Sequence, residues 1–553
     1  MTQDPWRVLL LYTDKYFLIK QIYPLGLNRI ANHLRRHGHD VTVAYPFLPD
    51  EDLGLNVPAL LKRHQPKVIG LGLRNLDTCM ACEQYGDFKG HGFRTFSFLP
   101  HVKEIVRILK KNAPNIPLVI GGGGFSFSPE AILRSLGLTY GIVGEGEEPM
   151  RLFIESLADK KTPTNIPGLA MCRGKEVCIN PRRAYMFDET GEAMPREAAF
   201  NYAYEKTGLS VQFKRGCDQK CSYCVEPIIE GKRFTFRSVE RVLMELNAYA
   251  QDSKFDNVRN IFFVDTEFNI PNLKNASALV RGILDTGLEQ RFGFSSQFLP
   301  KPFNNTFAGL LAKAGFSVIL TCDSFSDQVL EKNNVSYRRE HILKTIKLCQ
   351  EHSIPCTINL IFGLPGETRG TVDATLKDML QYPPTGLRTY EYTVGARIYQ
   401  GTPLQKLVQN KEHAPCLYGQ ESDGCLDPWF YCSPKSPLQL KQYIDQALPF
   451  PMEFRNNYSK DAHQALAVAY LADQQQFDQA LLRFSDCSLD ARLDIYDYFF
   501  RKLTSAGHIE PARRMSVQLL EAMQGHPNPE AYQERMGVVW FFLNLLGGPE
   551  AGG

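Results

Sequence analysis

Short apolar runs alternate with amphipathic stretches along the first 160 residues, and this alternation narrows the possible folds more than any other feature. Arg7–Tyr12 and Val68–Leu73 have the length and composition of strands that are buried on both faces. Between such runs, Pro24–Gly38 has apolar residues at helical spacing, with Pro24 suited to the start of a helix and Gly38 to its end. Alternation of this kind predicts an α/β fold with a doubly wound parallel sheet.

Three loops at the carboxyl ends of these predicted strands have unusual compositions. Ligands of open α/β sheets bind beyond the carboxyl ends of the strands, and consecutive glycines let a flat ligand approach the backbone because no Cβ intervenes. For any one loop, the alternative to a ligand site is that its glycines only let the chain turn from a strand into a helix. For Arg74 in the first loop, the alternative is an ion pair with a carboxylate such as Asp77. The candidate ligand-binding residues of the three loops are Arg74, Asn75, Asp77, Thr78, Gly122, Gly123, Phe125, Ser126, Gly144, Glu145 and Gly146.

Three cysteines, Cys217, Cys221 and Cys224, lie within eight residues on a loop that follows a predicted strand. Four-iron clusters use short cysteine loops of this kind, and three ligands leave one iron open for another donor. Zinc is the competing metal, but a structural zinc site usually has four ligands in paired clusters, and no complementary pair stands out. The C-x3-C-x2-C spacing therefore predicts an iron–sulfur cluster with three protein ligands.

The remaining cysteines give weaker signals. Cys79 and Cys82 form a lone C-x2-C pair, too little for a metal site. Cys416, Cys425 and Cys432 are irregularly spaced, so we expect buried or loop thiols there, with an auxiliary cluster as the alternative. Fourteen cysteines in a chain without an evident secretory signal are more typical of reduced thiols and metal ligands than of disulfides.

The cysteine loop, with Tyr223 before its last cysteine, resembles the radical S-adenosylmethionine (SAM) superfamily. The order of Pro24–Gly38, Gly121–Gly124 and Gly144–Glu147 resembles the cobalamin-binding domain that stands in front of many of these enzymes. The C-terminal third has helical periodicity. It would form either a helical cap over the mouth of the radical SAM barrel or a packing or partner-binding bundle. The implied architecture is a doubly wound cobalamin-binding domain over residues 1–160, a linker over 161–205, a partial (β/α)6 radical SAM barrel over 206–410 and a C-terminal helical domain over 411–553.

The resemblance implies three cofactors: a [4Fe–4S] cluster on the three cysteines, SAM on the open iron, and cobalamin in the N-terminal domain. The D-x-H-x-x-G signature that donates a histidine to cobalt in other cobalamin domains is missing. Arg74, or a neighbour from Asn75 to Thr78, would then cap the lower face of the corrin. An arginine at that place supplies no lone pair to the metal.

Roles for polar residues at the ends of the barrel strands also follow from the resemblance. Asp323 and Ser324 would bind the ribose hydroxyls of SAM, and Arg338 or its neighbour Arg339 would pair with the methionine carboxylate. A solvated surface position is the alternative for each of these side chains. Tyr223 completes the predicted cofactor-binding set.

Three residues are catalytic candidates. Asp265 and Glu267 follow a predicted strand, and either carboxylate would bind the methionine ammonium, the substrate or the open iron. Tyr399 lies in Gly395–Leu404, a segment that resembles the sixth strand of cobalamin-linked members.

A corrinoid domain ahead of such a barrel suggests a cobalamin-dependent C-methyltransferase. It would move a methyl group from SAM through methylcobalamin to a carbon of a natural-product, amino-acid or peptide substrate, with a reductant such as flavodoxin or ferredoxin. A ring-contracting or cyclising enzyme with the same cofactors is one alternative. A non-catalytic corrinoid-binding metal protein is another.

Composition argues against two further kinds of partner. The chain has 62 Lys and Arg residues against 60 Asp and Glu, and a net charge of +2 gives too weak a field to coat nucleic acid. No apolar run approaches the roughly 20 residues of a membrane helix, so we expect no membrane partner. Without a basic region and a cleavable apolar core at the start, we expect a cytoplasmic protein that acts on a small molecule or peptide.

Overall fold

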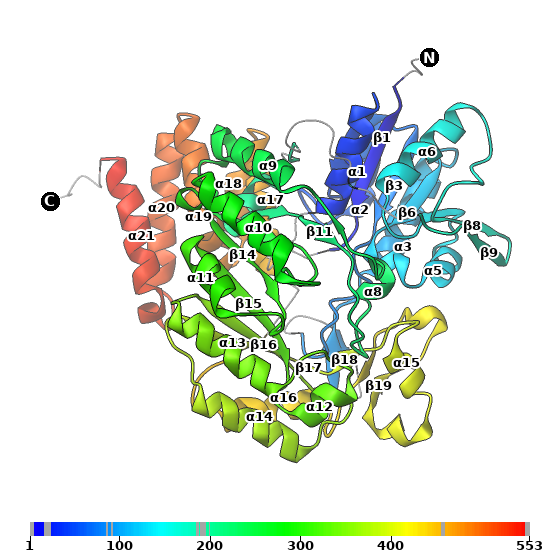
Figure 1. Cartoon of the computed structure of the whole chain (residues 1–553). Helices are drawn as coiled ribbons and strands as arrows, with labels where there is room; N and C mark the ends of the chain where they lie inside the picture. The colour runs from blue at the N-terminus through cyan, green and yellow to red at the C-terminus, as the bar shows by residue number, and fades with distance from the viewer. Residues whose placement is uncertain are drawn as a thin grey trace.

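Two large sheets organise the chain, one built from its N-terminal third and one from its centre (Figure 1). The computed structural model describes residues 5–15, 24–83, 87–89, 92–183, 187, 195–197, 200–454 and 459–547.

The first sheet has the strand order β2-β1-β3-β6-β7-β8-β9, and its strands from β2 to β7 run parallel. Helices cover both faces, since α1 packs on α6 and α2 packs on α3, which confirms the predicted doubly wound sheet. The elements are β1 (Arg7–Tyr12), β2 (Asp40–Ala44), β3 (Val68–Gly72), β6 (Leu118–Gly121), β7 (Tyr140–Ile142), β8 (Leu169–Arg173), β9 (Glu176–Ile179), α1 (Leu25–Arg36), α2 (Leu53–His64), α3 (Leu99–Asn112), α4 (Gly123–Ser126), α5 (Pro129–Leu136) and α6 (Glu147–Ala158).

Two features of this sheet lie outside the strand–helix alternation. β8 and β9 pair antiparallel and extend its edge, so a hairpin from the stretch predicted as linker adds to the first sheet. The long connection after β3 contains a second hairpin, formed by β4 (Asp87–Lys89) and β5 (Phe93–Thr95).

The second sheet has the order β10-β13-β14-β15-β16-β17-β21, with every neighbouring pair parallel. Its first six strands match the predicted partial barrel, and the short β21 joins them from much further along the chain. The strands are β10 (Leu209–Val211), β13 (Asn260–Phe263), β14 (Gly293–Phe298), β15 (Phe316–Asp323), β16 (Cys356–Phe362), β17 (Arg388–Val394) and β21 (Glu453–Phe454).

Helices cover one face of this second sheet (Figure 1). Buried rings on that face stack across strands, as Phe294 does with Phe316 at a centroid distance of 5.3 Å. Side chains on the other face of β14 to β17 alternate with them and are mostly half-buried, so that face borders a partly open space. The covering helices are α9 (Val239–Gln251), α10 (Leu273–Asp285), α11 (Asn305–Lys313), α13 (Arg339–Glu351), α14 (Arg369–Gln381) and α16 (Pro437–Ala447).

The C-terminal part is helical, as predicted, and α17 reaches back to the first sheet. The His463 ring on α17 lies 6.0 Å from the Tyr45 ring, which follows β2, and α17 also contacts α7 (Asn201–Thr207). This packing ties the C-terminal helices to both halves of the molecule. The helices are α17 (Lys460–Asp473), α18 (Phe477–Asp486), α19 (Leu489–Ser505), α20 (Ile509–Gln524) and α21 (Gln533–Leu545).

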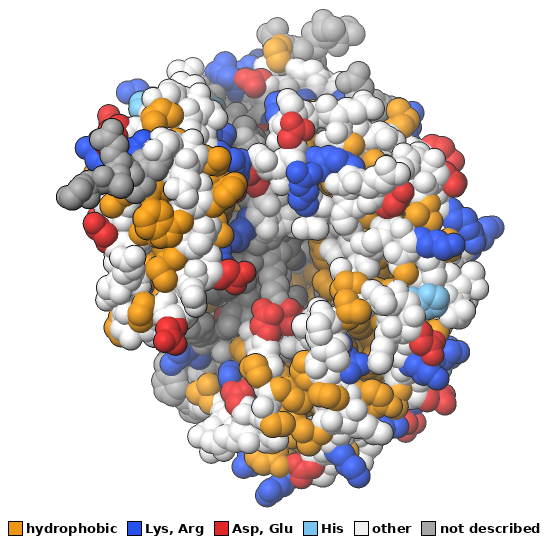
Figure 2. Space-filling model, turned by 90° about the vertical axis from the view of Figure 1, so that its left-hand side faces the viewer, with side chains coloured by type: hydrophobic (Ala, Val, Ile, Leu, Met, Phe, Trp, Pro, Cys, Tyr) orange, Lys and Arg blue, Asp and Glu red, His pale blue; other side chains and the backbone are white. Residues whose placement is uncertain are grey.

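The last helix, α21, leaves large apolar side chains exposed, among them Val538, Phe541 and Leu545. Figure 2 views the side of the molecule on which these helices lie, and hydrophobic side chains gather there beside a hollow. None of the helices in the described part of the chain combines the length and apolar character needed to cross a bilayer.

Candidate cofactor-binding site

The cysteine loop is framed by a short antiparallel pair, β11 (Lys214–Arg215) and β12 (Thr235–Phe236). Gly216 opens it at φ 101°, and a Cβ there would lie 2.3 Å from the Arg233 carbonyl oxygen, so the turn requires glycine. The backbone N–H of Cys217 then donates to the Gly231 carbonyl at 3.0 Å. These contacts fold the loop back on itself and hold its three cysteines close together.

The three thiols sit in a desolvated, electronegative environment. Burial raises the pKa of Cys217 to about 11, and it raises the pKa values of Cys221 and Cys224 further, with neighbouring thiols acting in the same direction. A bound metal would reverse this, because thiolate is the ligand form. Among the described residues, no three His, Cys, Asp or Glu side chains converge on a single-ion site. A cube of four irons instead places each thiolate on a different iron.

Asp265 and Glu267 follow β13 and face the same region. Asp265 Oδ1 accepts the backbone N–H groups of Phe213 at 2.8 Å and Lys214 at 3.1 Å, whereas its Oδ2 is buried without a partner. Glu267 Oε1 accepts the Thr321 hydroxyl at 2.8 Å, and its Oε2 is likewise unpaired. Burial raises the pKa of Asp265 to about 6 and that of Glu267 to about 7.

Asp323 ends β15 at φ 54° and anchors the cysteine loop to the barrel. Its Oδ2 accepts the hydroxyls of Tyr223 at 2.6 Å and Tyr337 at 3.1 Å, while its Oδ1 is buried and unpaired. On the adjacent strand, Asn359 Oδ1 is also buried without a partner. Tyr223 of the cysteine loop therefore bonds directly to Asp323, the residue predicted to bind the ribose.

The unpaired atoms of Asp265, Glu267 and Asp323 are all oxygen acceptors, at the carboxyl ends of β13 and β15 in the same sheet. A buried polar atom without a partner costs about 1–3 kcal/mol, so a group of them indicates a ligand that supplies donors. The ammonium and ribose hydroxyls of SAM are donors of that kind. Thiols for three irons and acceptors for SAM together fit the predicted cluster and cosubstrate.

Sequence reasoning missed Thr321, Asn359 and Tyr337. Thr321 and Asn359 were detectable as polar residues at alternate positions of apolar strands, which places them on the face away from the helices. Tyr337 stands directly before Arg338 in the segment assigned to the methionine carboxylate. Nothing in the sequence pairs it with Asp323, 14 residues earlier.

Two predicted residues lie apart from this group. Ser324 turns toward α14, where its hydroxyl lies 3.3 Å from that of Thr375, instead of toward a ribose. Arg338 pairs with Glu331 at 3.2 Å and donates to the carbonyls of Val335 and Tyr337, because it stands at the start of the surface helix α13. The adjacent Arg339 pairs with Asp378.

The glycines of the N-terminal loops pack against the protein itself. A Cβ on Gly122 would lie 2.3 Å from the Leu73 carbonyl oxygen, and one on Gly123 would lie 3.1 Å from that of Arg74. A Cβ on Gly144 would lie 2.5 Å from Nε of Arg182. The space beside each of these glycines is taken by the protein's own backbone or by the Arg182 side chain. We therefore assign no corrin contact to them.

Other predicted residues of these loops are structural. The Phe125 ring is fully buried and fills the space over Gly141, where a Cβ would lie 2.1 Å from it. Ser126 joins two loops, because its hydroxyl donates to the Gly122 carbonyl at 2.8 Å and accepts the Gly144 N–H at 2.9 Å. Thr78 is buried and accepts the N–H of Phe96 at 3.4 Å.

The loop after β3 is fixed by a buried carboxylate. Asp14, which follows β1, accepts the backbone N–H groups of Arg74 and Asn75 at 3.1 Å each. Burial raises the pKa of Asp14 to about 7, and Arg74 acts in the opposite direction. Asp77 bonds to Arg397, so the alternative of an Arg74–Asp77 pair is wrong.

Tyr399, from the segment after the barrel strands, lies against residues of the N-terminal part of the chain. Its hydroxyl contacts Sγ of Cys79 at 2.7 Å, and its ring lies 4.9 Å from that of Phe127. Cys425 and Cys432 are buried and Cys416 is half-buried, around a small sheet of β18 (Ala396–Arg397), β20 (Trp429–Tyr431) and β19 (Leu417–Gly419).

The segment after the cysteines lies against the N-terminal loops. α8 (Glu226–Ile229) begins two residues after Cys224, and a Cβ on Gly123 would lie 3.6 Å from the Ile229 side chain. Arg182 donates to the Ile229 carbonyl at 2.8 Å and pairs with Glu145 at 3.2 Å. The predicted cluster loop and the predicted cobalamin loops therefore meet directly.

A second contact joins the same two regions. Arg215 of β11 pairs with Glu147, the first residue of α6, at 2.8 Å. Burial alone would raise the pKa of Glu147, but the Arg215 charge holds it at about 2. This ion pair fixes the base of the cysteine loop to the helix that follows the Gly144–Gly146 loop.

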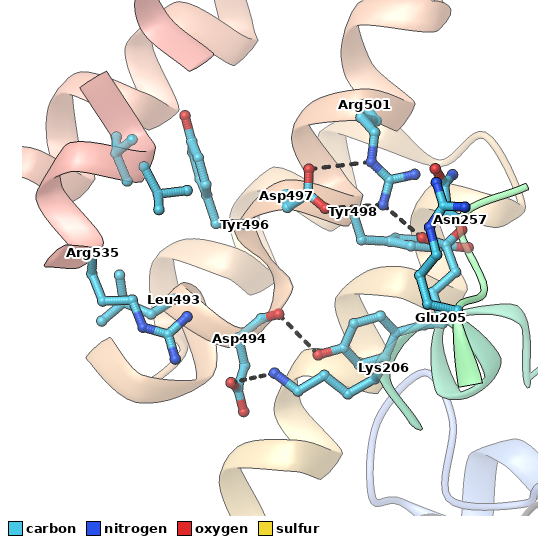
Figure 3. A pocket seen from close by; sticks show the side chains of 14 residues that line it. Glu205, Lys206, Asn257, Leu493, Asp494, Tyr496, Asp497, Tyr498, Arg501 and Arg535 are labelled. Atoms are coloured by element: carbon cyan, nitrogen blue, oxygen red, sulfur yellow. Dashed lines mark hydrogen bonds and ion pairs between the residues drawn. The ribbon is translucent and has the colours of Figure 1, made fainter. Parts of the chain in front are cut away.

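A separate polar cavity of about 330 Å³ lies beside the C-terminal helices (Figure 3). Its charged side chains pair with one another: Arg501 with Glu205 at 2.6 Å, and Lys206 with Asp494 at 2.7 Å. Its walls include α7 and residues 257–259, which precede β10 and β13. The cavity therefore lies at the opposite end of these strands from the cysteine loop.

Comparison with known proteins agrees with this arrangement. Residues 211–379 match the radical SAM superfamily, and residues 20–154 match the B12 binding domain. The tryptophan 2-C-methyltransferase of Streptomyces laurentii is 24% identical over 507 residues, which span 80% of this chain and 80% of that protein.

Solved structures show the same fold. The radical SAM methyltransferase TsrM from Kitasatospora setae, with cobalamin and a [4Fe–4S] cluster bound, is 21% identical with a TM-score of 0.69, covering 86% of this chain and 99% of that one. A TsrM structure with tryptophan substrate and the SAM analogue aza-SAM matches at 22% identity, with the same TM-score and coverage. The cobalamin-dependent enzyme OxsB with aqua-cobalamin bound is 15% identical with a TM-score of 0.62, covering 98% of this chain and 79% of that one. The chain therefore contains a radical SAM domain preceded by a B12-binding domain.

Proposed function

We propose that this protein is a cobalamin-dependent radical SAM C-methyltransferase, which moves a methyl group from SAM to a carbon of its substrate. One observation carries the proposal: α8, directly after the three thiols, packs against Gly123 and bonds to Arg182 at the edge of the first sheet. Transfer between a cluster-bound cosubstrate and a corrinoid requires that their two loops meet. The methyltransferase activity named for the Streptomyces and Kitasatospora relatives supports the same reaction.

The chain's own residues would bind and orient the cofactors. The three thiols would each take one iron, Glu267 Oε2 and Asp265 Oδ2 would accept the methionine ammonium, and Asp323 Oδ1 would accept a ribose hydroxyl. When bound, the cluster supplies an electron to SAM and cobalamin carries the methyl group. Because Asp323 also holds Tyr223, the ribose and the cysteine loop would be positioned by one carboxylate.

We assign Arg74 to the lower face of the corrin. It stands at the carboxyl end of β3 with its backbone N–H held by Asp14, and its charge lowers the pKa of Glu226 on α8 against the larger effects of burial and Glu230. A Cβ on Gly123 would lie 3.1 Å from the Arg74 carbonyl oxygen and 3.6 Å from the Ile229 side chain, so the Arg74 backbone is close to the segment that follows the cysteines. A guanidinium has no lone pair for cobalt, so it would exclude a lower ligand instead of providing one.

Anaerobic reconstitution followed by incubation with methyl-labelled SAM tests the proposal. We expect about four irons per chain, a stoichiometric corrinoid, and label that passes into the corrinoid and then into a product. Stoichiometric zinc without iron would indicate a non-catalytic metal protein. A rearranged product without label would indicate a ring-contracting or cyclising enzyme.

The proposal includes a cytoplasmic location and a one-electron reductant such as flavodoxin or ferredoxin. All fourteen cysteines are free thiols, which is typical of proteins in reducing compartments.

A further inference from the structure

The uncovered face of the second sheet continues directly from the candidate site. Thr321, which bonds to Glu267, pairs in register with Asn359 on the next strand, and Asn359 pairs with Glu391 on the strand after that. These side chains share the face opposite the helices, because they alternate with the buried residues that pack under the helices. We call the half-buried positions of β14 to β17 the inner wall.

The inner wall consists mainly of hydroxyl and amide side chains. Among its members are Ser295 and Gln297 on β14, and Thr357 and Thr393 on β16 and β17. Ile319 and Ile361 are its apolar members. No aromatic side chain stands at a half-buried position of these four fully described strands.

The neighbouring strand β13 carries a half-buried aromatic residue, Phe262, which pairs in register with Ser295. Ser295 pairs in turn with Ser317, four residues before Thr321 on β15, so Phe262 lies at a level of the sheet below Thr321. A stacking site needs the face of an aromatic ring at the place where the ligand binds. A single ring at the edge of the inner wall therefore gives an aromatic substrate nothing to stack on beside Thr321 and Asn359.

We propose that the substrate is a hydrophilic molecule that carries hydroxyl and amino groups, and that the inner wall recognises it through Thr321, Asn359 and their neighbours. This inference rests on the proposed function and names its substrate class. Asn359 Oδ1 is buried and unpaired, and the proposed SAM contacts do not use it, so the inner wall offers a buried acceptor that receives no donors from the protein. An amine or a row of hydroxyls supplies those donors.

The same wall disfavours an indole. Tryptophan is the substrate bound in one TsrM structure, and its ring offers a single N–H donor. Filling the space beside Thr321, Thr357 and Asn359 with that ring would remove water from their polar groups without replacing its hydrogen bonds. Sites built to bind polar groups reject analogues that lack them by roughly 10⁴-fold or more.

Calorimetric titration of the anaerobic holoenzyme, loaded with cluster, cobalamin and SAM, tests the inference. The probes are D-glucosamine, a compact molecule with an ammonium and several hydroxyls, and L-tryptophan. We expect saturable binding of glucosamine and at least about tenfold weaker binding of tryptophan. Asn359→Leu is expected to weaken glucosamine binding about tenfold or more. The matched control Ile358→Val, whose side chain packs on the helix side of the same strand, is expected to leave it unchanged.

Label from methyl-labelled SAM is followed into the corrinoid in the same preparations. Tryptophan that binds as tightly as glucosamine, no saturable glucosamine binding, or unchanged binding in Asn359→Leu would overturn the inference. If label reaches the corrinoid in that case, the proposed function stands without this substrate class. If no label reaches the corrinoid, both fail.

Discussion

The Asp77 carboxylate accepts a hydrogen bond from Nε of Arg397 at 2.8 Å, and both side chains are 1% exposed although 320 residues separate them in the chain. The Arg397 guanidinium also donates to the carbonyls of Ile398 at 2.7 Å and Cys425 at 2.8 Å. Asp77 belongs to the loop after β3 and Arg397 to β18. This buried pair therefore joins the B12-binding part of the chain to the segment that follows the barrel strands.

Replacing Arg397 by leucine leaves the Asp77 carboxylate buried without its partner. Breaking a buried pair in this way typically costs about 3–5 kcal/mol, so we expect a lower free energy of unfolding in urea. The double variant Asp77→Asn/Arg397→Leu should recover part of the lost free energy of unfolding, because it also removes the negative charge of the unpaired Asp77 carboxylate. Lys161→Ala, which breaks an exposed pair with Asp159, is the control and should behave as wild type.

Cys217→Ala should remove the cluster and spare the corrinoid. Cys217 is buried in the loop between β11 and β12, whereas the B12-binding loops lie on the first sheet. We expect iron content after reconstitution to fall to a small fraction of the wild-type value, with the corrinoid retained. The exposed Cys178 on β9 provides the control variant Cys178→Ala. Full iron content or retained turnover in Cys217→Ala would contradict the cluster assignment.

Glu367 predicts a loss of stability as the pH rises. Its Oε2 accepts the Gly363 N–H, its Oε1 is buried and unpaired, and burial raises its pKa from 4.5 to about 8. The folded state thus holds a proton that the unfolded state releases, so stability falls between pH 4.5 and about 8. Glu367→Gln keeps an acceptor and should flatten this fall by a few kcal/mol. Identical pH profiles of the unfolding midpoint in variant and wild type would refute the assignment; Glu412→Gln is the exposed control.

His463 predicts a loss of stability in the opposite direction. Burial lowers its pKa from 6.5 to about 4, so the unfolded chain takes up a proton that the folded chain does not. Its contribution is complete above pH 6.5 and is lost as the pH falls toward about 4. In His463→Gln we expect this acid loss to shrink by on the order of 3 kcal/mol. The measurement is the unfolding free energy at several pH values, with the exposed His508→Gln as the comparison; an unchanged acid slope would argue against a neutral His463.

The sequence alone was enough to predict the two α/β sheets, the helical C-terminus and the cysteine triplet. These features are carried by short-range patterns: strand and helix periodicities extend over a few residues, and Cys217, Cys221 and Cys224 share one loop. Asp265, Glu267 and Asp323 were also identifiable, because each is a carboxylate at the carboxyl end of a predicted strand, and such ends meet at one edge of a parallel sheet.

The tertiary structure decided which groups meet. Gly122 and Gly144 suit a ligand cradle by composition, yet they lie against Leu73 and Arg182, because the docking of separate loops determines what occupies the space that a glycine leaves. Strand register determines that Thr321 faces Glu267 and that Asn359 stands beside it, and the packing of distant segments brings Asp77 to Arg397. Such contacts depend on how whole elements pack, and no local spacing of residues encodes them.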